Sequence, residues 1–295
     1  MSQKFTVGLI QPNALDDMQA NIAFVQQQAR KARDAGAQFI LTPENVALMD
    51  FGRKNLLARS YPEASHPALA AFRDLARELD VWFLAGSLHV HPDDRAGVDD
   101  RADDRIANRS LLIDPQGNVA ARYDKIHMFD VDLKGGESYR ESSTFRPGAQ
   151  AVVTPTPWGL LGMTICYDLR FPYLYRDLAH AGASMITIPA AFTRPTGQAH
   201  WHVLQRARAI ETGCYVFCPA QTGEHANGRK TFGHSLVVAP WGEVIADAGT
   251  EPGFITAQID LAKVDEARGM VPAIRHDRDY APAQGAPQPL RQAGE

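Results

Sequence analysis

Short apolar segments alternate with amphipathic helical segments in two separate parts of the sequence. The first alternation runs through residues 4–90, where the apolar segments are "KFTVGLIQ", "AQFILTPEN" and "VWFLAGSLHV". In the helical segment that follows the first of them, Ile22, Val25, Ala29 and Ala32 recur on one helical face. A strand–helix–strand unit normally places its two strands in parallel, so this order predicts a sheet with helices packed on one face.

The second alternation begins near Leu160, with "LLGMTIC", "SMITIPA" and "CYVFCPA" as strands and "PYLYRDLAHAG" and "AHWHVLQRARAIETG" as helices. Three further segments carry proline at the second and glycine at the fourth position of a turn: "DPQG" at Asp114, "TPWG" at Thr156 and "APWG" at Ala239. Strand-like sequence flanks each of them, which is typical of antiparallel hairpins. The sequence therefore predicts an α/β fold in which mixed sheets carry helices on their outer faces.

Composition and charge limit the partners that the protein can have. The chain has 295 residues and a net charge of -4, which leaves no overall basic field for nucleic acid or an anionic membrane. No stretch approaches the roughly 20 apolar residues of a membrane span, and the N-terminus does not resemble a signal peptide. Three cysteines are too few for a disulfide framework in a chain of this size. We therefore expect a cytoplasmic protein whose partner is a small molecule.

Three chemically reactive side chains follow predicted strands. Glu44 comes after "FILTP", Lys125 after "NVAARYD" and Cys166 after "LLGMTI". Active sites of α/β proteins lie at the carboxyl ends of strands, and charged groups there can satisfy one another if they converge. Taken singly, Cys166 could equally be an inert core cysteine, Glu44 a surface carboxylate and Lys125 a solvated lysine.

A converging arrangement would support nucleophilic chemistry. A thiol has a pKa of about 8.5, so a nucleophilic cysteine needs a base or a cation beside it. Glu44 would serve as the base, while Lys125 would favour the thiolate and stabilise the oxyanion of a tetrahedral intermediate. The backbone N–H of Tyr167, at the start of a helix, would be a second oxyanion donor.

Six segments occur in an order that resembles the nitrilase superfamily of carbon–nitrogen hydrolases. They span nearly the whole chain: "LTPEN", "YDKIHMFDVD", "YRESSTFRPG", "TICYDLRFP", "TGQAHWHVLQRARAIETGCYV" and "FGHSLVVAPWGEV". The motif around Cys166 and the "AHW…RARAIE" segment are most similar to the branch that contains deaminated glutathione amidases and omega-amidases.

The resemblance implies a four-layer α-β-β-α sandwich over a single domain of residues 1–280, followed by an irregular tail at 281–295. It implies a triad of Glu44, Lys125 and Cys166 that hydrolyses a small amide to an acid and ammonia through a thioester. No metal or organic cofactor takes part in this chemistry, and a homodimer or higher homo-oligomer is expected.

Further site residues are expected from the same resemblance. Glu141, in "YRESS", would position the lysine and the hydrolytic water. Substrates of this branch carry a carboxylate, and Arg170 and Arg194 are the candidate partners for it. Phe192 would form an apolar wall of the pocket, although an aromatic residue here could equally belong to the core. Arg170 could instead form a structural ion pair with Asp168 or with Glu141.

Two positions depart from the relatives. Tyr173 and His202 both stand where a carboxylate is common, as in "RFPEL" and "AHWE". If His202 faces the substrate, it will change how the amide is held; if it faces outward, it will have little effect. The sequence does not decide between these orientations.

Other functions are compatible with some of the same residues. An enzyme for N-carbamoyl compounds or nitriles would use the same triad, as would an omega-amidase acting on 2-oxoglutaramate. A papain-like enzyme would pair Cys166 with His127, His200 or His234. A non-catalytic scaffold would have no need of an intact triad, and the triad residues are all present.

No metal site is predicted. "HVH" at His89 and "HWH" at His200 are isolated pairs, and Cys214 with Cys218 lacks a second pair of ligands.

Overall fold

Two β-sheets form the centre of the protein in the computed structural model, which describes residues 4–50, 52–91, 103–133, 138–226 and 228–281. The first sheet has the strand order β17-β1-β2-β4-β5-β6, with β3 paired to β4. Its strands are β1 (Lys4–Gln11), β2 (Phe39–Leu41), β3 (Tyr61–Pro62), β4 (Trp82–His91), β5 (Ala107–Ile113), β6 (Val119–Asp124) and β17 (Gly253–Asp260).

The second sheet has the strand order β16-β15-β12-β11-β10-β9. Its strands are β9 (Val152–Pro155), β10 (Leu160–Met163), β11 (Met185–Thr187), β12 (Tyr215–Cys218), β15 (Leu236–Val238) and β16 (Val244–Asp247). Along the main strand order of each sheet the central strands are parallel and the outer ones antiparallel, as the two strand–helix alternations and the hairpin turns predict. The two-residue strand β3 pairs parallel to β4.

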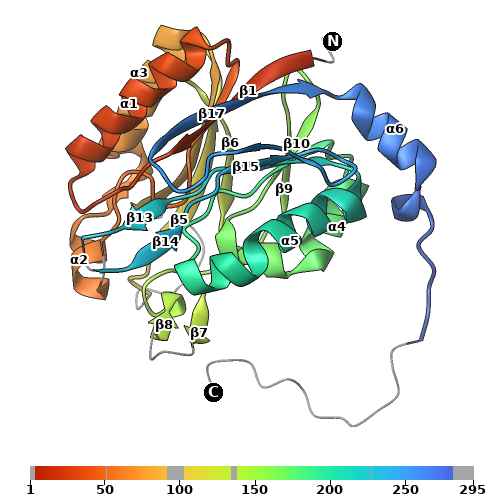
Figure 1. Cartoon of the computed structure of the whole chain (residues 1–295). Coiled ribbons are helices and arrows are strands. Elements are labelled where there is room, and N and C mark those ends of the chain that lie inside the picture. The colour runs from red at the N-terminus through yellow and green to blue at the C-terminus, as the bar shows by residue number, and fades with distance from the viewer. Residues whose placement is uncertain (1–3, 51, 92–102, 134–137, 227, 282–295) are drawn as a thin grey trace.

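Helices cover the outer faces of both sheets. Figure 1 shows α1 and α3 against the first sheet and α4 and α5 against the second, so the layers run α-β-β-α. The helices are α1 (Met18–Asp34), α2 (Arg53–Ala58), α3 (Pro67–Leu79), α4 (Pro172–His180), α5 (Arg194–Thr212) and α6 (Ala262–Met270). The expected four-layer sandwich is confirmed. Among the described residues, no helix combines the length and apolar character needed to cross a membrane.

The alternation of side chains along β2 explains why two layers of core exist. Phe39 and Leu41 point to the core between the sheets, where the ring of Phe39 meets that of Phe217 on β12 edge to face at 6.3 Å. Ile40 points the other way, into the apolar cluster beneath α1 and α3. Because successive side chains of a strand face opposite sides, a continuous apolar segment suits a strand that is buried on both faces.

Local sequence signals set the boundaries of several elements. Asp17 caps α1 by accepting hydrogen bonds from the N–H groups of Gln19 and Ala20 at 3.0 and 3.1 Å. The apolar face predicted for this helix is buried. The three proline–glycine turns join β5 to β6, β9 to β10 and β15 to β16, and all three pairs are antiparallel as predicted.

One helix begins earlier than the sequence pattern predicts. The helical pattern starts at Ala199, but α5 begins at Arg194. Pro195 suits the first turn because its missing N–H would have no helical partner there. Gly197 lets Phe232 pack closely, since a Cβ at this position would lie 2.3 Å from the Cβ of Phe232.

Two short hairpins border the pocket and were not predicted. They are β7 (Asp130–Asp132) with β8 (Ser138–Arg140), and β13 (Thr222–Glu224) with β14 (Lys230–Phe232). Their strands have three residues each and are largely polar, so they carry little periodic signal. Of the predicted tail, only Ala281 lies within the described residues.

Candidate active site

The backbone around Glu44 is fixed by a close contact with strand β4. Glu44 follows β2, and the chain just before it passes directly over Gly86 of β4. A Cβ at Gly86 would lie 1.9 Å from the carbonyl oxygen of Thr42 and 2.5 Å from that of Pro43. Only glycine therefore fits at this position, and its contact sets where the Glu44 side chain emerges.

Cys166 occupies a strained turn at the end of β10. It is the first residue of a 3₁₀ turn, η3 (Cys166–Arg170), and its φ of 49° lies in the left-handed region that residues other than glycine seldom adopt. Its N–H donates to Pro189 O at 2.9 Å, and the buried carboxylate of Asp168 accepts from Ile165 N at 2.9 Å. These bonds hold the turn, which presents the thiol to the pocket.

The same turn supplies a backbone donor. Tyr167 is the second residue of η3, and the first N–H groups of such a turn have no acceptor within it. Tyr167 and Cys166 both line the pocket. The role of the Tyr167 N–H as an oxyanion donor stays a prediction.

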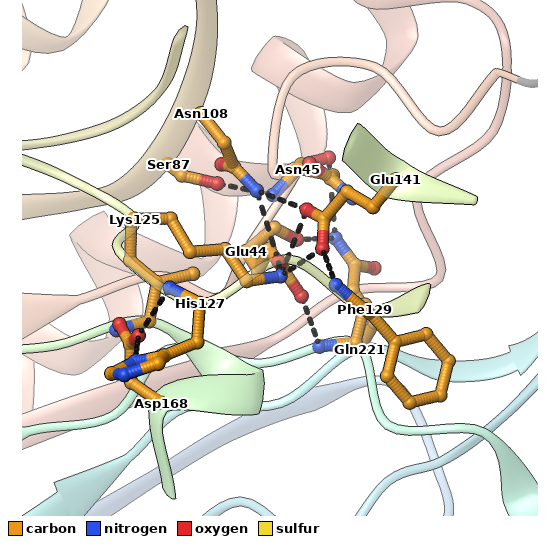
Figure 2. A network of polar contacts seen from close by, with 12 residues as sticks. Glu44, Asn45, Ser87, Asn108, Lys125, His127, Phe129, Glu141, Asp168 and Gln221 are labelled. Atoms are coloured by element: carbon orange, nitrogen blue, oxygen red, sulfur yellow. Dashed lines mark hydrogen bonds and ion pairs between the residues drawn. The ribbon is translucent and has the colours of Figure 1, made fainter. Parts of the chain in front are cut away.

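Lys125 links two carboxylates in the interior. Its ammonium donates to Glu44 Oε1 at 2.8 Å, to Glu141 Oε1 at 2.9 Å and to Glu141 Oε2 at 2.8 Å (Figure 2). Only 2% of the Lys125 side chain is exposed. An ammonium buried this deeply needs charged partners, and here it has two.

Neutral donors hold both carboxylates in place. Asn108 Nδ2 donates to Glu44 Oε1 at 3.0 Å and to Glu141 Oε1 at 3.3 Å. The N–H of Ala191 donates to Glu44 Oε2 at 3.0 Å, and that of Phe129 donates to Glu141 Oε2 at 2.6 Å. Each carboxylate is thus oriented by an ammonium, an amide side chain and a backbone N–H (Figure 2).

The charges in this network determine its protonation state. Burial alone would raise the pKa of Glu44, but the Lys125 ammonium lowers it below the ordinary value. Burial alone would lower the pKa of Lys125, but the charges of Glu141 and Glu44 raise it well above the ordinary value. The site therefore holds an ionised Glu44 and a protonated Lys125 at neutral pH.

The cysteine behaves differently from the sequence expectation. Burial, followed by the charge of Glu44, raises the pKa of the Cys166 thiol well above its ordinary value, and the opposing effect of Lys125 is smaller. Lys125 therefore does not hold a thiolate in the resting site. The thiol is therefore neutral in the resting site, and it lies close enough to the Glu44 carboxylate for each group to shift the pKa of the other.

A pocket of about 330 Å³ opens in front of the thiol. Cys166, Glu44, Lys125 and Glu141 all line it, so the four expected catalytic residues converge on one cavity. Its size suits a small molecule. Three arginines also line the pocket, namely Arg53, Arg140 and Arg229.

The residues expected to bind substrate divide into two groups. Phe192 lines the pocket as Tyr167 does, and the Arg170 guanidinium stands 5.9 Å from the ring centre of Tyr167 and 5.4 Å from that of Phe192. Arg170 Nη1 lies 3.3 Å from His200 Nδ1 rather than beside Asp168 or Glu141. Arg170 thus lies behind the pocket wall, without lining it.

Arg194 and His202 lie outside the pocket lining. Arg194 is exposed at the start of α5, and His202 Nε2 lies 3.1 Å from Asp247 Oδ2. The expectation that these two side chains contact substrate is not supported, because a helix sends successive residues to different faces and only the first turn of α5 reaches the pocket.

The imidazoles considered as partners of Cys166 all have other neighbours. His127 Nδ1 lies 2.7 Å from Asp168 Oδ1, and its Nε2 lies 2.6 Å from the Tyr173 hydroxyl. His234 pairs with Asp247 at 2.9 Å. Tyr173 thus takes the place of a carboxylate by bonding to His127. The arrangement favours Glu44, not a histidine, as the base.

Two functional candidates were missed in the sequence. Asn108 donates to both carboxylates, and an asparagine in the strand-like segment "ANRSLLI" is a signal that could have identified it. Arg229 lines the pocket, donates to Ala191 O at 2.5 Å and lies 5.2 Å from the ring centre of Tyr139. It lies between the short strands β13 and β14, and no pattern marked it.

The fold and the pocket define a class of enzyme: an α-β-β-α sandwich whose pocket combines a thiol, an ammonium and two carboxylates. Residues 6–269 match the family described as "Carbon-nitrogen hydrolase". The chain belongs to this family and is a hydrolase acting on carbon–nitrogen bonds other than peptide bonds.

Known proteins resemble the chain over most of its length. It is 39% identical over 276 residues to a "Deaminated glutathione amidase" of Yersinia enterocolitica, and the match covers 92% of each. The C. elegans NitFhit structure has a TM-score of 0.83 and 33% identity over 94% of this chain and 66% of that one. A mutant of the amidase from Nesterenkonia sp. AN1, which carries acrylamide at its active site cysteine, has a TM-score of 0.74 and 25% identity over 90% of this chain and 98% of that one.

Proposed function

We propose that the protein is a cysteine-dependent amidase that hydrolyses a small carboxylate-bearing amide to an acid and ammonia or, when the amide is substituted as in deaminated glutathione, to an acid and an amine. The observation that carries this proposal is the convergence of the neutral Cys166 thiol and the ionised Glu44 carboxylate in one pocket, with Lys125 and Glu141 beside them. The name of the Yersinia enterocolitica relative and the cysteine adduct of the Nesterenkonia enzyme agree with it.

The first half of the reaction forms a thioester. Cys166 Sγ attacks the amide carbonyl while its proton passes to Glu44. The negative charge that develops on the carbonyl oxygen is stabilised by the Lys125 ammonium and the Tyr167 N–H. Glu44 then gives the proton to the amide nitrogen, the carbon–nitrogen bond breaks, and ammonia leaves from a primary amide or an amine from a substituted one.

The second half releases the acid. Glu44, ionised again, takes a proton from water as the water oxygen attacks the thioester carbonyl. The carbon–sulfur bond breaks, and the proton returns from Glu44 to the Cys166 sulfur. Glu141 keeps Lys125 charged and oriented in both halves, since both of its oxygens accept from the ammonium.

Positive charge at the pocket favours an anionic substrate. Burial raises the pKa of Glu44, and the charge of Arg229 joins that of Lys125 in lowering it, so Arg229 acts on the catalytic carboxylate. Arg229 lines the pocket beside the Ala191 carbonyl, and Arg170 lies behind the Tyr167 and Phe192 rings. We assign Arg229 as the first candidate for the substrate carboxylate and Arg170 as the second.

Release of the leaving amine tests the proposal. Purified protein is incubated with deaminated glutathione, 2-oxoglutaramate, succinamate, an N-carbamoyl amine and a nitrile, each beside a Cys166→Ala control. Cysteinylglycine is measured for deaminated glutathione, whose amide nitrogen belongs to that dipeptide, and ammonia is measured for the other compounds. Selective release of cysteinylglycine from deaminated glutathione, absent in the control, is expected. Preference for 2-oxoglutaramate would identify an omega-amidase instead, and release that persists in Cys166→Ala would refute the cysteine mechanism.

The cellular setting belongs to the same proposal. Cys166, Cys214 and Cys218 are free thiols, which suits a reducing compartment such as the cytoplasm. We expect a homodimer or higher homo-oligomer, and light scattering coupled to size-exclusion chromatography measures the mass directly. A monomer at micromolar concentration would contradict this expectation.

A further inference from the structure

Two histidines and an aspartate from three elements meet outside the pocket. His202 lies on α5, His234 immediately precedes β15, and Asp247 ends β16. His202 Nε2 lies 3.1 Å from Asp247 Oδ2, while His234 Nδ1 lies 2.9 and 3.1 Å from the two oxygens of Asp247. One atom of each residue lies within 4.8 Å of the other two. None of the three residues lines the active-site pocket.

The cluster is held rigidly by its surroundings. The ring of His234 stacks on Phe232 with centroids 4.5 Å apart, and the ring of His202 meets Phe232 edge to face at 6.0 Å. The N–H of Gly249 donates to Asp247 Oδ1 at 2.8 Å and orients the carboxylate. Neighbours that orient the ligand side chains in this way favour metal binding over a mobile surface ion pair between histidine and aspartate.

The backbone conformation of His234 is a second, independent feature of the cluster. Its φ of 55° lies in the left-handed region, which is uncommon for a residue with a side chain. Its N–H donates to Gly249 O at 2.7 Å, and its carbonyl accepts from the indole N–H of Trp201 at 2.7 Å. These bonds sustain a conformation that directs the imidazole toward Asp247.

We propose that His202, His234 and Asp247 form a binding site for a divalent transition-metal ion, with Zn²⁺ the best fit. Two imidazole nitrogens and one carboxylate oxygen are ligands that Zn²⁺ accepts, and water completes a tetrahedron. Ligand atoms about 2.0–2.2 Å from such an ion lie roughly 3.4 Å apart. The His–Asp distances need to open by a few tenths of an ångström, and the two imidazole nitrogens need to turn toward a common point.

The electrostatic environment allows a cation to enter. The side chains of His202, Asp247 and His234 are 38%, 33% and 24% exposed, so an ion and its water ligand can reach them. Within the described part of the chain, no lysine or arginine forms an ion pair with Asp247. The two imidazoles are its only side-chain partners there, and a metal ion would replace their protons.

The site connects to the substrate pocket through one helix. Trp201, adjacent to His202 on α5, packs on Phe192 with ring centroids 4.8 Å apart, and Phe192 lines the pocket. An ion shared by α5 and the β15–β16 hairpin would fix this helix against the second sheet. Metal occupancy would therefore stabilise the fold and hold the Phe192 wall.

Zinc titration of tag-free protein tests the site. The Cys166→Ala protein is used because it removes the active-site thiol as a competing ligand. After treatment with EDTA and exchange into buffer, it is titrated with Zn²⁺ by calorimetry. One ion per chain is expected, and His202→Ala or Asp247→Asn in the same background should weaken binding at least about tenfold. His200→Ala, an exposed histidine two residues away on the same helix, should leave the affinity unchanged.

Thermal unfolding separates metal binding from misfolding. Zn²⁺ should raise the Tm of the Cys166→Ala protein, since a ligand bound only by the native state stabilises that state. The Tm of a folded His202→Ala variant should not rise. If that variant does not fold, His202→Gln replaces it, because its amide can still bond to Asp247. Absence of zinc binding at millimolar concentration, or equal binding by the cluster variants, would overturn the proposal.

Discussion

Removing the ammonium of Lys125 gives a strong test of the buried network. In Lys125→Met, the carboxylates of Glu44 and Glu141, which both contact the Lys125 Nζ at 2.8 Å, lose their shared cation. At 2.8 Å and an effective dielectric constant of about 20, each attraction amounts to roughly 6 kcal/mol before desolvation is subtracted. Breaking a buried ion pair typically costs about 3–5 kcal/mol, and we expect a loss in the free energy of unfolding within that range.

The pH dependence of this loss has a defined sign. In the native protein the pKa of Glu44 is lowered, so its contribution to stability is present above the unfolded pKa and is lost as the pH falls through the folded pKa. Without Lys125, burial and the neighbouring Glu141 raise the folded pKa of Glu44 above its unfolded value. The contribution is then present at low pH and is lost as the pH rises through the folded pKa, so the variant should weaken from about pH 4.3 upward.

Urea unfolding between pH 4 and 8 measures this effect. The matched control is Lys230→Met, which removes an exposed ion pair with Glu224 of 3.3 Å and should change stability by about 0–1 kcal/mol at every pH. A Lys125→Met protein that loses less than about 1 kcal/mol, or that follows the pH profile of the control, would refute the account of the network.

Three further predictions concern the pocket. Gly86→Ala should lower both the Tm and the activity, because the added Cβ would lie 1.9 Å from Thr42 O. Thermal unfolding and kcat measure the two effects, and a variant with normal values of both would contradict the prediction. The rate of Cys166 alkylation by iodoacetamide should keep rising from pH 7 to beyond the ordinary thiol pKa of about 8.5, because the pKa of Cys166 is raised; a plateau near pH 7 would indicate a resting thiolate. Arg229→Met should raise KM for an acidic amide at least about tenfold and leave KM for a neutral amide nearly unchanged, so equal effects in steady-state kinetics would remove Arg229 as the carboxylate partner.

Much of the fold follows from local patterns in the sequence. Asp17 marks the start of α1, and the continuous apolar segment around Ile40 marks a strand buried on both faces. Proline and glycine at fixed turn positions identify three hairpins. These features depend on neighbours within a few residues, which is why they can be predicted without knowing the tertiary structure.

The site is less predictable because its contacts join distant segments. Glu44, Lys125 and Cys166 were identified by residue type, strand position and family resemblance, but the raised pKa of Cys166 depends on burial that only the fold creates. Arg229 reaches the pocket from a hairpin with no periodic pattern. The sequence left the orientation of His202 open. In the structure its side chain lies on the face of α5 that contacts Asp247.

The central claim is that Cys166 carries the acyl group of the substrate, and trapping that intermediate tests it most directly. The protein is mixed with excess deaminated glutathione, quenched in acid within the first turnovers and analysed by intact-mass and peptide mass spectrometry. The account predicts an added mass equal to the substrate less its cysteinylglycine leaving group, located on the peptide that contains Cys166 and absent from Cys166→Ala. Hydrolysis of the substrate at the native rate by Cys166→Ala, or an adduct on another residue, would contradict it.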